Sequence, residues 1–128
     1  MREIKLRAWE KNLKAMISVD SIDFKARLIN MESAWRMFEE IELMQYTGLK
    51  DKNGVEIYEG DIVQPSNRAK DRFVIVWKDS GFQRKYTFIR KYDGEEWEET
   101  THLPIYPSGH VVIGNIYENP ELLEESAE

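Results

Sequence analysis

The chain has 128 residues and a formal net charge of −6, and this length fits one domain or two very small domains that share a core. It contains no cysteine, which excludes zinc ribbons, thiol catalysis and disulfide scaffolds. A chain of this size needs no metal or disulfide to fold, and we expect no cofactor. It has no basic leader before an apolar segment and no run of about 18 apolar residues, so we expect a cytoplasmic protein that does not enter a membrane.

Two strands are predicted near the start of the chain. Residues 3–9 (EIKLRAW) alternate apolar and polar side chains, and this period of two is typical of a half-buried strand. Residues 10–12 suit a turn, and residues 15–19 (AMISV) then return the chain as the second strand. Residues 21–29 are a weaker candidate for a third strand.

Residues 30–41 allow two interpretations. In the first they form a helix, with Asn30 as the N-cap and apolar residues at helical spacing. Those apolar residues are Met31, Ala34, Trp35, Phe38 and Ile41. In the second, residues 30–33 form a turn between the strands ARLI and AWRMF. The sequence favours neither.

The segment MQYTGLKDKNGVEIYEGDIV, residues 44–63, is rich in turn-forming residues. Two glycine turns close together reverse the chain twice, as the corners of a small barrel require. Neither a phosphate-binding glycine loop nor a calcium-binding loop has this spacing, so we predict a scaffold rather than a metal or phosphate site. The residues assigned to turns, here and further along, are Gly48, Asn53, Gly54, Gly60, Asp61, Asp93, Gly94 and Gly114.

The second half of the chain continues with strands. Residues 73–77 (FVIVW) read as a continuous apolar strand, and residues 86–92 (YTFIRKY) alternate. The Asp93-Gly94 pair after them is a hairpin signal, with residues 95–101 as the returning strand. Residues 110–117 (HVVIGNIY) form the last predicted strand.

A short helix is predicted over residues 120–125. Asn119 suits the N-cap, Pro120 the first helical position, and Glu121 complements the helix dipole. Many short strands, glycine turns and little room for helices together predict a mainly β protein.

Three segments resemble one family of proteins. The combination of IKLRAWE, LMQYTGLKDKNGVEIYEGDIV and VIGNIYENPELL is similar to the YopX-like proteins, which phages and prophages encode. Glu10 departs from the family pattern, which more usually has Asp there. The resemblance implies an N-terminal β-rich portion over residues 1–45, followed over residues 46–128 by an SH3-like small β-barrel with a C-terminal helix and acidic tail. It implies no settled biochemical activity.

Charge is segregated in the second half of the chain. Residues 61–92 carry eight cations and three aspartates, net +5, whereas residues 93–128 carry ten acidic residues and no Lys or Arg, net −10. The acidic part suits a solubilising surface. The basic block either contacts an acidic partner or pairs with the acidic block inside the fold.

Single-stranded nucleic acid is one candidate ligand, because such binders combine a cationic track with aromatic platforms for stacking. The candidate residues are Arg68, Lys70, Arg72, Lys78, Arg84, Lys85, Tyr86, Arg90, Lys91 and Tyr92. In the alternative interpretation the aromatic residues of this stretch, Trp77 and Phe82 included, fill the core, and the cations coat its outside.

A non-catalytic protein-binding or self-assembling accessory factor is the favoured function. The basic and acidic segments are complementary, so they can meet between the subunits of a homo-oligomer, and a host protein is a second possible partner. We predict no enzyme. His102 and His110 are the only imidazoles, no nucleophile motif accompanies them, and the glutamates at 95, 96, 98 and 99 read as solvated surface.

Overall fold

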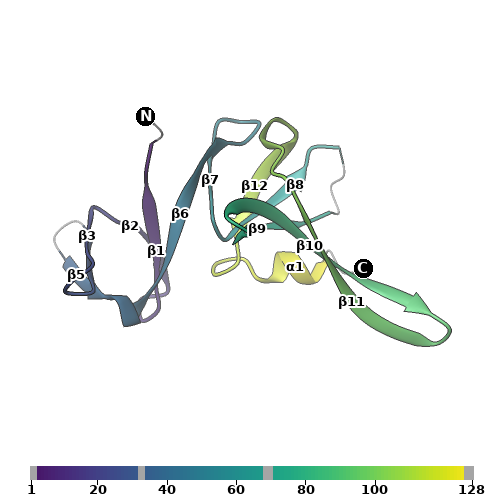
Figure 1. The fold of residues 1–128 in the computed structure, drawn as a ribbon, viewed down its shortest axis with the longest axis horizontal. Helices are drawn as coiled ribbons and strands as arrows, with labels where there is room; N and C mark the ends of the chain where they lie inside the picture. Colours follow the sequence, from purple (N-terminus) through teal and green to yellow (C-terminus); the bar gives the residue numbers. More distant parts are fainter. Residues whose placement is uncertain (1–2, 32–33, 68–70, 126–128) are drawn as a thin grey trace. The chain divides into compact units, whose positions relative to one another are not determined.

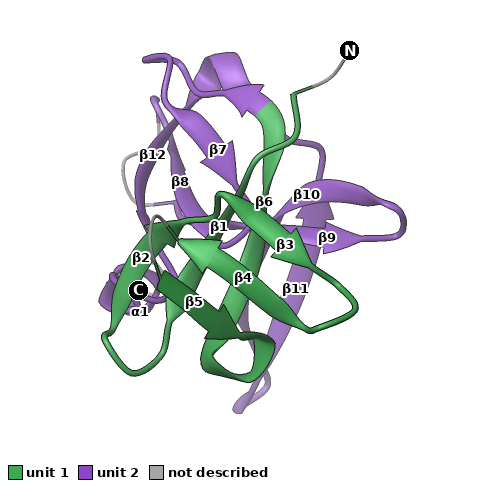
Figure 2. Cartoon of the chain, turned by 90° about the vertical axis from the view of Figure 1, so that its left-hand side faces the viewer, with its two compact units in different colours: residues 1–48 green, residues 49–128 purple. Residues whose placement is uncertain are grey.

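A computed structural model of the protein describes residues 3–31, 34–67 and 71–125. Within these ranges the fold is mainly β: twelve strands form three antiparallel sheets, one of them a curled half-barrel, and one short helix lies near the C-terminus (Figure 1). The chain divides into unit 1 (Met1–Gly48) and unit 2 (Leu49–Glu128), shown in green and purple in Figure 2. No helix in the described part is long and apolar enough to cross a membrane.

The elements of unit 1 are strands and one short 3-10 helix. They are β1 (Leu6–Glu10), β2 (Ala15–Ser18), β3 (Ser21–Asp23), β4 (Leu28–Met31), β5 (Ala34–Met37), η1 (Phe38–Glu40) and the greater part of β6 (Ile41–Lys50). Strands β2, β1 and β6 lie side by side in one sheet, and β3, β4 and β5 form another. The core of the unit is Ala8, Ile29 and Ile41, with partly buried apolar side chains around them.

The structure decides between the two interpretations of residues 30–41. The described residues of this range contain no α-helix: β4 and β5 pair antiparallel with Asn30 opposite Trp35, and Phe38–Glu40 form η1. The interpretation as two strands is therefore correct, although Asn30 and Met31 of the predicted turn lie in β4, and residues 32–33 lie outside the described residues. The prediction of one strand over residues 21–29 is wrong, because a turn over residues 24–27 separates β3 from β4. Asp23 accepts the backbone N–H of Ala26 in that turn, which is the side-chain geometry that favours turns over extended chain.

Glu10 is buried and closes the first hairpin. Its side chain is 1% exposed and accepts the backbone N–H groups of Asn12 and Leu13 at 2.9 and 3.0 Å. The Arg36 guanidinium lies 3.8 Å from the same carboxylate. These contacts satisfy a buried charge that is otherwise costly to desolvate.

Unit 2 contains six whole strands in the described part of the chain. They are β7 (Glu56–Tyr58), β8 (Asp61–Pro65), β9 (Phe73–Lys78), β10 (Gly81–Tyr92), β11 (Glu95–Leu103) and β12 (His110–Asn115), with the 3-10 helix η2 (Pro107–Gly109) and the helix α1 (Glu121–Glu125). Five strands form a sheet in the order β11-β10-β9-β8-β12, and the first sheet has the order β2-β1-β6-β7. The core cluster is Ile57, Val63, Phe73 and Ile75.

Two buried carboxylates hold the turn-rich segment together. Asp51 Oδ1 accepts the N–H groups of Asn53 and Val55, and Asp51 Oδ2 accepts the N–H of Val112 on β12 at 2.8 Å. Asp61 accepts the N–H of Tyr58 at 2.7 Å. Gly54 takes the left-handed backbone that the sequence predicts there, with φ at +83° and no atom near its missing side chain.

The strands predicted over residues 73–77, 86–92 and 95–101 are present as parts of β9, β10 and β11. The core interpretation of their aromatic residues holds for Tyr86, which packs against the core cluster. It is wrong for Trp77 and Tyr92, which are 55% and 76% exposed. Trp77 lies near the end of β9, beyond the buried residues 73–75. The apolar run of the sequence therefore continues past the part of the strand that is buried in the core.

Candidate functional site

The described cations of the predicted nucleic-acid track do not gather on one surface. Arg68 and Lys70 lie outside the described residues. Successive side chains of a strand point to opposite faces, so Arg84 and Arg90 lie on one face of β10, and Lys85 and Lys91 on the other. Lys78, on β9, lies 3.4 Å from the ring of His102, and Arg72 donates to the carbonyl oxygen of Asp71.

The far ends of β10 and β11 form an exposed two-stranded ribbon. Strand β9 pairs with β10 only over residues 81–85, so beyond that point β10 has β11 as its neighbour in the sheet. Figure 1 shows this hairpin extending past the other strands of unit 2. We call residues 87–92 and 95–100 the outer ribbon, and Asp93-Gly94 forms its tip, with positive φ at both residues.

Glutamates of β11 neutralise the arginine and the lysine of the outer ribbon. Arg90 Nε donates to Glu99 at 3.1 Å, and Lys91 lies 3.3 Å from Glu96, its direct cross-strand partner. Hydrogen bonds from the Trp97 indole and from Arg90 lower the pKa of Glu99, so this carboxylate is ionised at neutral pH. The basic and acidic blocks of the sequence therefore meet here inside one chain.

One face of the outer ribbon is aromatic. Phe88, Arg90 and Tyr92 of β10 share this face with Trp97 of β11, because directly opposed residues of two strands point the same way. Phe88 stacks on Tyr86 with ring centroids 5.5 Å apart, and the Arg90 guanidinium lies over the Phe88 ring. Tyr92 is 76% and Trp97 is 43% exposed. The face thus presents aromatic surface to solvent beside paired charges.

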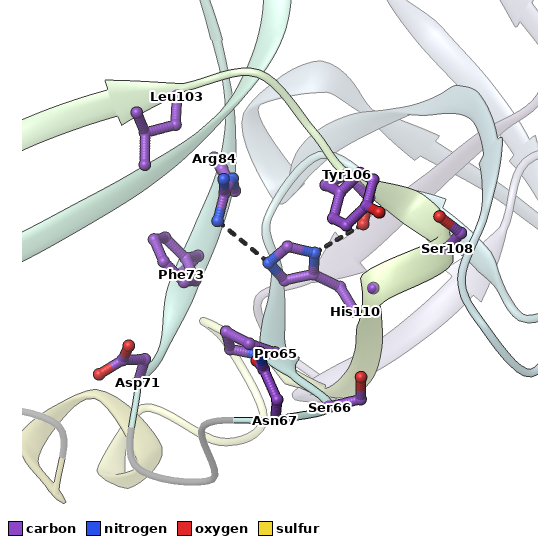
Figure 3. A pocket seen from close by; sticks show the side chains of 11 residues that line it. Pro65, Ser66, Asn67, Asp71, Phe73, Arg84, Leu103, Tyr106, Ser108 and His110 are labelled. Carbon is purple, nitrogen blue, oxygen red and sulfur yellow. Dashed lines mark hydrogen bonds between the residues drawn. The ribbon is translucent and has the colours of Figure 1, made fainter.

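A pocket of about 590 Å³ lies at the other end of β10 (Figure 3). Phe73, Leu103, Pro65 and Tyr106 supply apolar walls, whereas Ser66, Asn67 and Ser108 supply polar groups. Arg84 and His110 also line it and are joined by a hydrogen bond, and Figure 3 shows Phe73 between Arg84 and Asp71. This volume is within the range of small-molecule pockets, about 300–1,000 Å³.

Arg84 is held in place by three neighbours. Its Nε donates to the carbonyl oxygen of Pro104 at 2.8 Å, its Nη1 lies 3.1 Å from His110 Nε2, and its guanidinium lies 4.7 Å from the centroid of the Phe73 ring. Burial lowers the pKa of Arg84, although a guanidinium stays cationic at any physiological pH. Among the described residues no carboxylate forms an ion pair with it.

His110 is neutral, and its two ring nitrogens have fixed roles. Nδ1 lies 2.6 Å from the carbonyl oxygen of Tyr106, which only accepts, so Nδ1 carries the proton. Nε2 then accepts from Arg84. Burial, the largest cause, lowers the pKa of His110, the positive charge of Arg84 lowers it further, and the hydrogen bond to Tyr106 opposes both. The side chain is 3% exposed.

Gly109 gives the Tyr106 ring its position in the pocket wall. A Cβ at residue 109 would lie 2.6 Å from two ring carbons of Tyr106, which is closer than real Cβ atoms approach. Gly114 has a related role, because a Cβ there would collide with the side chain of Asn119. That side chain accepts the N–H of Asn115, so Gly114, which we assigned to a turn, instead lies in β12 at an irregularity of its pairing.

Gly60 and Gly94 lie in turns with positive φ, as Gly54 does. Gly48 also has positive φ but lies within β6 rather than in a turn. Asn53 lies in the loop that Asp51 holds, and Asp61 is buried at the start of β8. Within the described ranges no three His, Asp or Glu side chains are placed to hold a metal ion.

Sequence reasoning missed the pocket. It assigned Arg84 to a phosphate track and weighed His110 only together with His102, but the two histidines have different partners, Arg84 and Lys78. Tyr106, Phe73 and Pro65 carried no functional signal. The useful signal was that His110 is one of only two imidazoles and begins a strand beside a Ser-Gly turn.

Comparisons with known proteins agree with this fold. The model of the family described as YopX protein matches residues 5–124. Among solved structures, protein EF1440 from Enterococcus faecalis is similar, with 27% sequence identity, a TM-score of 0.69, and coverage of 96% of this chain and 99% of that one. No protein with a curated description matches the chain.

Proposed function

The chain belongs to the YopX family, and from this premise we propose that it is a phage- or prophage-encoded accessory protein that binds another protein without catalysis. It acts in the cytoplasm of the bacterial host. We also infer that unit 2 is an SH3-like small barrel, an assignment that the curled half-barrel supports. Such barrels carry many unrelated functions, so the proposal rests on the surface of unit 2 rather than on its fold.

The aromatic face of the outer ribbon carries the proposal. Exposed aromatic side chains at the centre of a surface are typical anchors of protein interfaces, where tyrosine, tryptophan and arginine contribute most of the binding energy. Tyr92, Trp97 and Arg90 are of these types and lie on one face. Arg90 is already oriented by Glu99 and Phe88, so little rotamer freedom remains for it to lose on binding.

Local charge favours a protein partner over nucleic acid. Residues 87–100 carry two cations and five carboxylates, a net charge of −3, so the outer ribbon repels phosphates. The same charge disfavours face-to-face pairing of two copies. The partner that fits best presents apolar and basic side chains, since complementary charges steer the encounter.

The edge of β11 supports a contact through the face rather than through backbone pairing. Strand β11 lies at the end of its sheet and carries Glu95, Glu96, Glu98 and Glu99. Charged side chains on an edge strand oppose pairing with the strand of another molecule. A second copy of the chain brings the same carboxylates, so the opposition is strongest there.

Site-specific photo-crosslinking tests the proposal. A benzophenone amino acid replaces Tyr92, and the matched control places it at Phe24 in unit 1, because the two side chains are 76% and 75% exposed. In host cells we expect a nuclease-resistant adduct with a protein from position 92 and not from position 24. Trp97→Ser, added to the position-92 variant, is expected to weaken that adduct.

Three outcomes contradict the proposal. Equal adducts from positions 92 and 24 would show nonspecific capture. An adduct of twice the chain's own mass would make a second copy the partner and favour the homo-oligomer. A nuclease-sensitive adduct would favour single-stranded nucleic acid.

A further inference from the structure

We propose that the pocket at the inner end of β10 binds a small organic acid, with the carboxylate on Arg84 and an apolar body against Phe73 and Leu103. The proposal concerns a surface other than the outer ribbon and does not depend on the partner proposed for that ribbon. It rests on the free donors of Arg84, the walls of the pocket and the charge around it.

The guanidinium of Arg84 is fixed in position but incompletely used. It has five N–H donors, of which one is directed to Pro104 and one to His110. Three remain on Nη1 and Nη2 without a partner in the described part of the chain. Because Nε and Nη1 are already engaged, the side chain is oriented before a ligand arrives, which reduces the entropy lost on binding. A planar fork of this kind matches a carboxylate.

The walls of the pocket specify an apolar body. Phe73 is 5% exposed and packs on Tyr86, while Leu103 packs against the same core cluster. The Tyr106 ring stands over Gly109 and lies edge-on to His110, with ring centroids 6.2 Å apart. A ring or short aliphatic chain bound beside these groups removes apolar surface from water. Ser108 can satisfy a polar substituent of the ligand.

The charge around Arg84 favours a monoanion over a phosphate. His110 is neutral, so Arg84 is the one cationic side chain among the described residues that line the pocket. Asp71 adds a carboxylate to the same pocket, and it has an interaction of its own that keeps it engaged. A phosphate monoester carries about −1.5 to −2 charge at neutral pH and would leave charge uncompensated there. One carboxylate balances one guanidinium.

Phenylacetate is a suitable probe, because it combines one carboxylate with one aromatic ring. Isothermal titration calorimetry on the full chain is expected to show saturable binding of phenylacetate and none of phenylacetamide, which lacks the charge. Arg84→Gln is expected to weaken binding about tenfold to a hundredfold, since hydrogen bonds to charged groups contribute about 1.5–3 kcal/mol. Arg84→Lys, which keeps the charge and loses the fork, is expected to weaken it less.

Arg90→Gln is the matched control. Arg90 lies on the same face of the same strand, over an aromatic ring and hydrogen-bonded, but outside the pocket. This variant is expected to bind phenylacetate like the wild type. Should Arg84→Gln fail to fold, NMR of the wild type replaces it: titration is expected to shift the Nε–H signal of Arg84 and the ring signals of His110, and to leave Arg90 unmoved.

The proposal is overturned by any of three results. One is the absence of calorimetric heat and of NMR shifts at a large excess of phenylacetate. Another is equal loss of binding in the Arg84 and Arg90 variants. The third is tighter binding of phenyl phosphate than of phenylacetate, which would assign the pocket to phosphate esters instead.

Discussion

Arg84 and Arg90 lie on one face of the same strand, each over a phenylalanine ring, yet their electrostatic environments differ. In the outer ribbon Arg90 pairs with Glu99 of β11. At the inner end Arg84 lies opposite Leu103 and contacts a carbonyl oxygen and a neutral imidazole. Register with the neighbouring strand therefore decides which arginine is neutralised and which keeps donors for a ligand.

The two ends of β10 also differ in what supports them. The inner end pairs with β9 and covers the core cluster, whereas the outer ribbon is a two-stranded hairpin with no third strand paired to it in the described structure. Two-stranded hairpins are marginally stable alone, so the outer ribbon depends on the sheet from which it extends. The following predictions measure this difference.

Matched isoleucines are expected to show the largest effect. Ile75 is fully buried in the core cluster and Ile89, on the outer ribbon, is 39% exposed. Ile75→Ala should reduce the free energy of unfolding by about 2–5 kcal/mol through lost burial and a cavity. Ile89→Ala should reduce it by less than about 1 kcal/mol, as for most surface changes. Urea denaturation measures both, and equal losses would refute the contrast between the two ends.

Two carboxylates make a second comparison. Asp51→Ala leaves three backbone N–H groups without their acceptor, so we expect a loss of about 3 kcal/mol in the free energy of unfolding. Glu99→Gln, in the outer ribbon, should leave the denaturation midpoint close to that of the wild type, because exposed ion pairs contribute little. A wild-type midpoint for Asp51→Ala would show that these bonds are replaceable.

Two glycines with the same backbone strain and no steric crowding make a third comparison. Gly54 and Gly94 both have positive φ, and a Cβ at either would meet open space. A β-branched residue tolerates this conformation poorly, so Gly54→Val should cost about 1–2 kcal/mol in global stability. Gly94→Val should instead increase hydrogen exchange within the outer ribbon and leave global stability almost unchanged. An unchanged midpoint for Gly54→Val would contradict the assigned role of this glycine.

The smallest expected effect concerns pH. The pKa of His110 is lowered in the folded state, so between that value and about 6.5 the unfolded state binds more protons. The stabilisation is complete above about pH 6.5 and is lost as pH falls through the folded-state pKa, with a slope of at most about 1.4 kcal/mol per pH unit. Arg84, Asp71 and Tyr106 are the titratable groups of the pocket around this ring.

Urea denaturation of the wild type and of His110→Gln at about pH 7.5 and about pH 5 isolates this contribution, because the two proteins contain the same carboxylates. The wild type should lose more stability on acidification than the variant does. Equal losses would show that His110 titrates alike in the folded and unfolded states.

Local chemistry was enough to predict much of the fold. Apolar patterning predicted β1, β2, β9 and β10, and Asp93-Gly94 predicted the hairpin of β10 and β11. The backbone needed at Gly54 was predicted because so few residues adopt positive φ readily. Residues 30–41 were not decided by their sequence, because their apolar side chains suit either period until β4 and β5 pair.

The sequence by itself determined a mainly β chain, its principal turns and the presence of opposed basic and acidic segments. Only the tertiary structure decided that Arg90 and Lys91 are neutralised, that Trp77 is exposed, and that Arg84 and His110 share a pocket. The physical reason is that strand period and turn preference act between near neighbours in the chain. Neutralisation and burial depend instead on the register of paired strands, as in β10 and β11, and on pairing between segments far apart in sequence, as in β12 and β8.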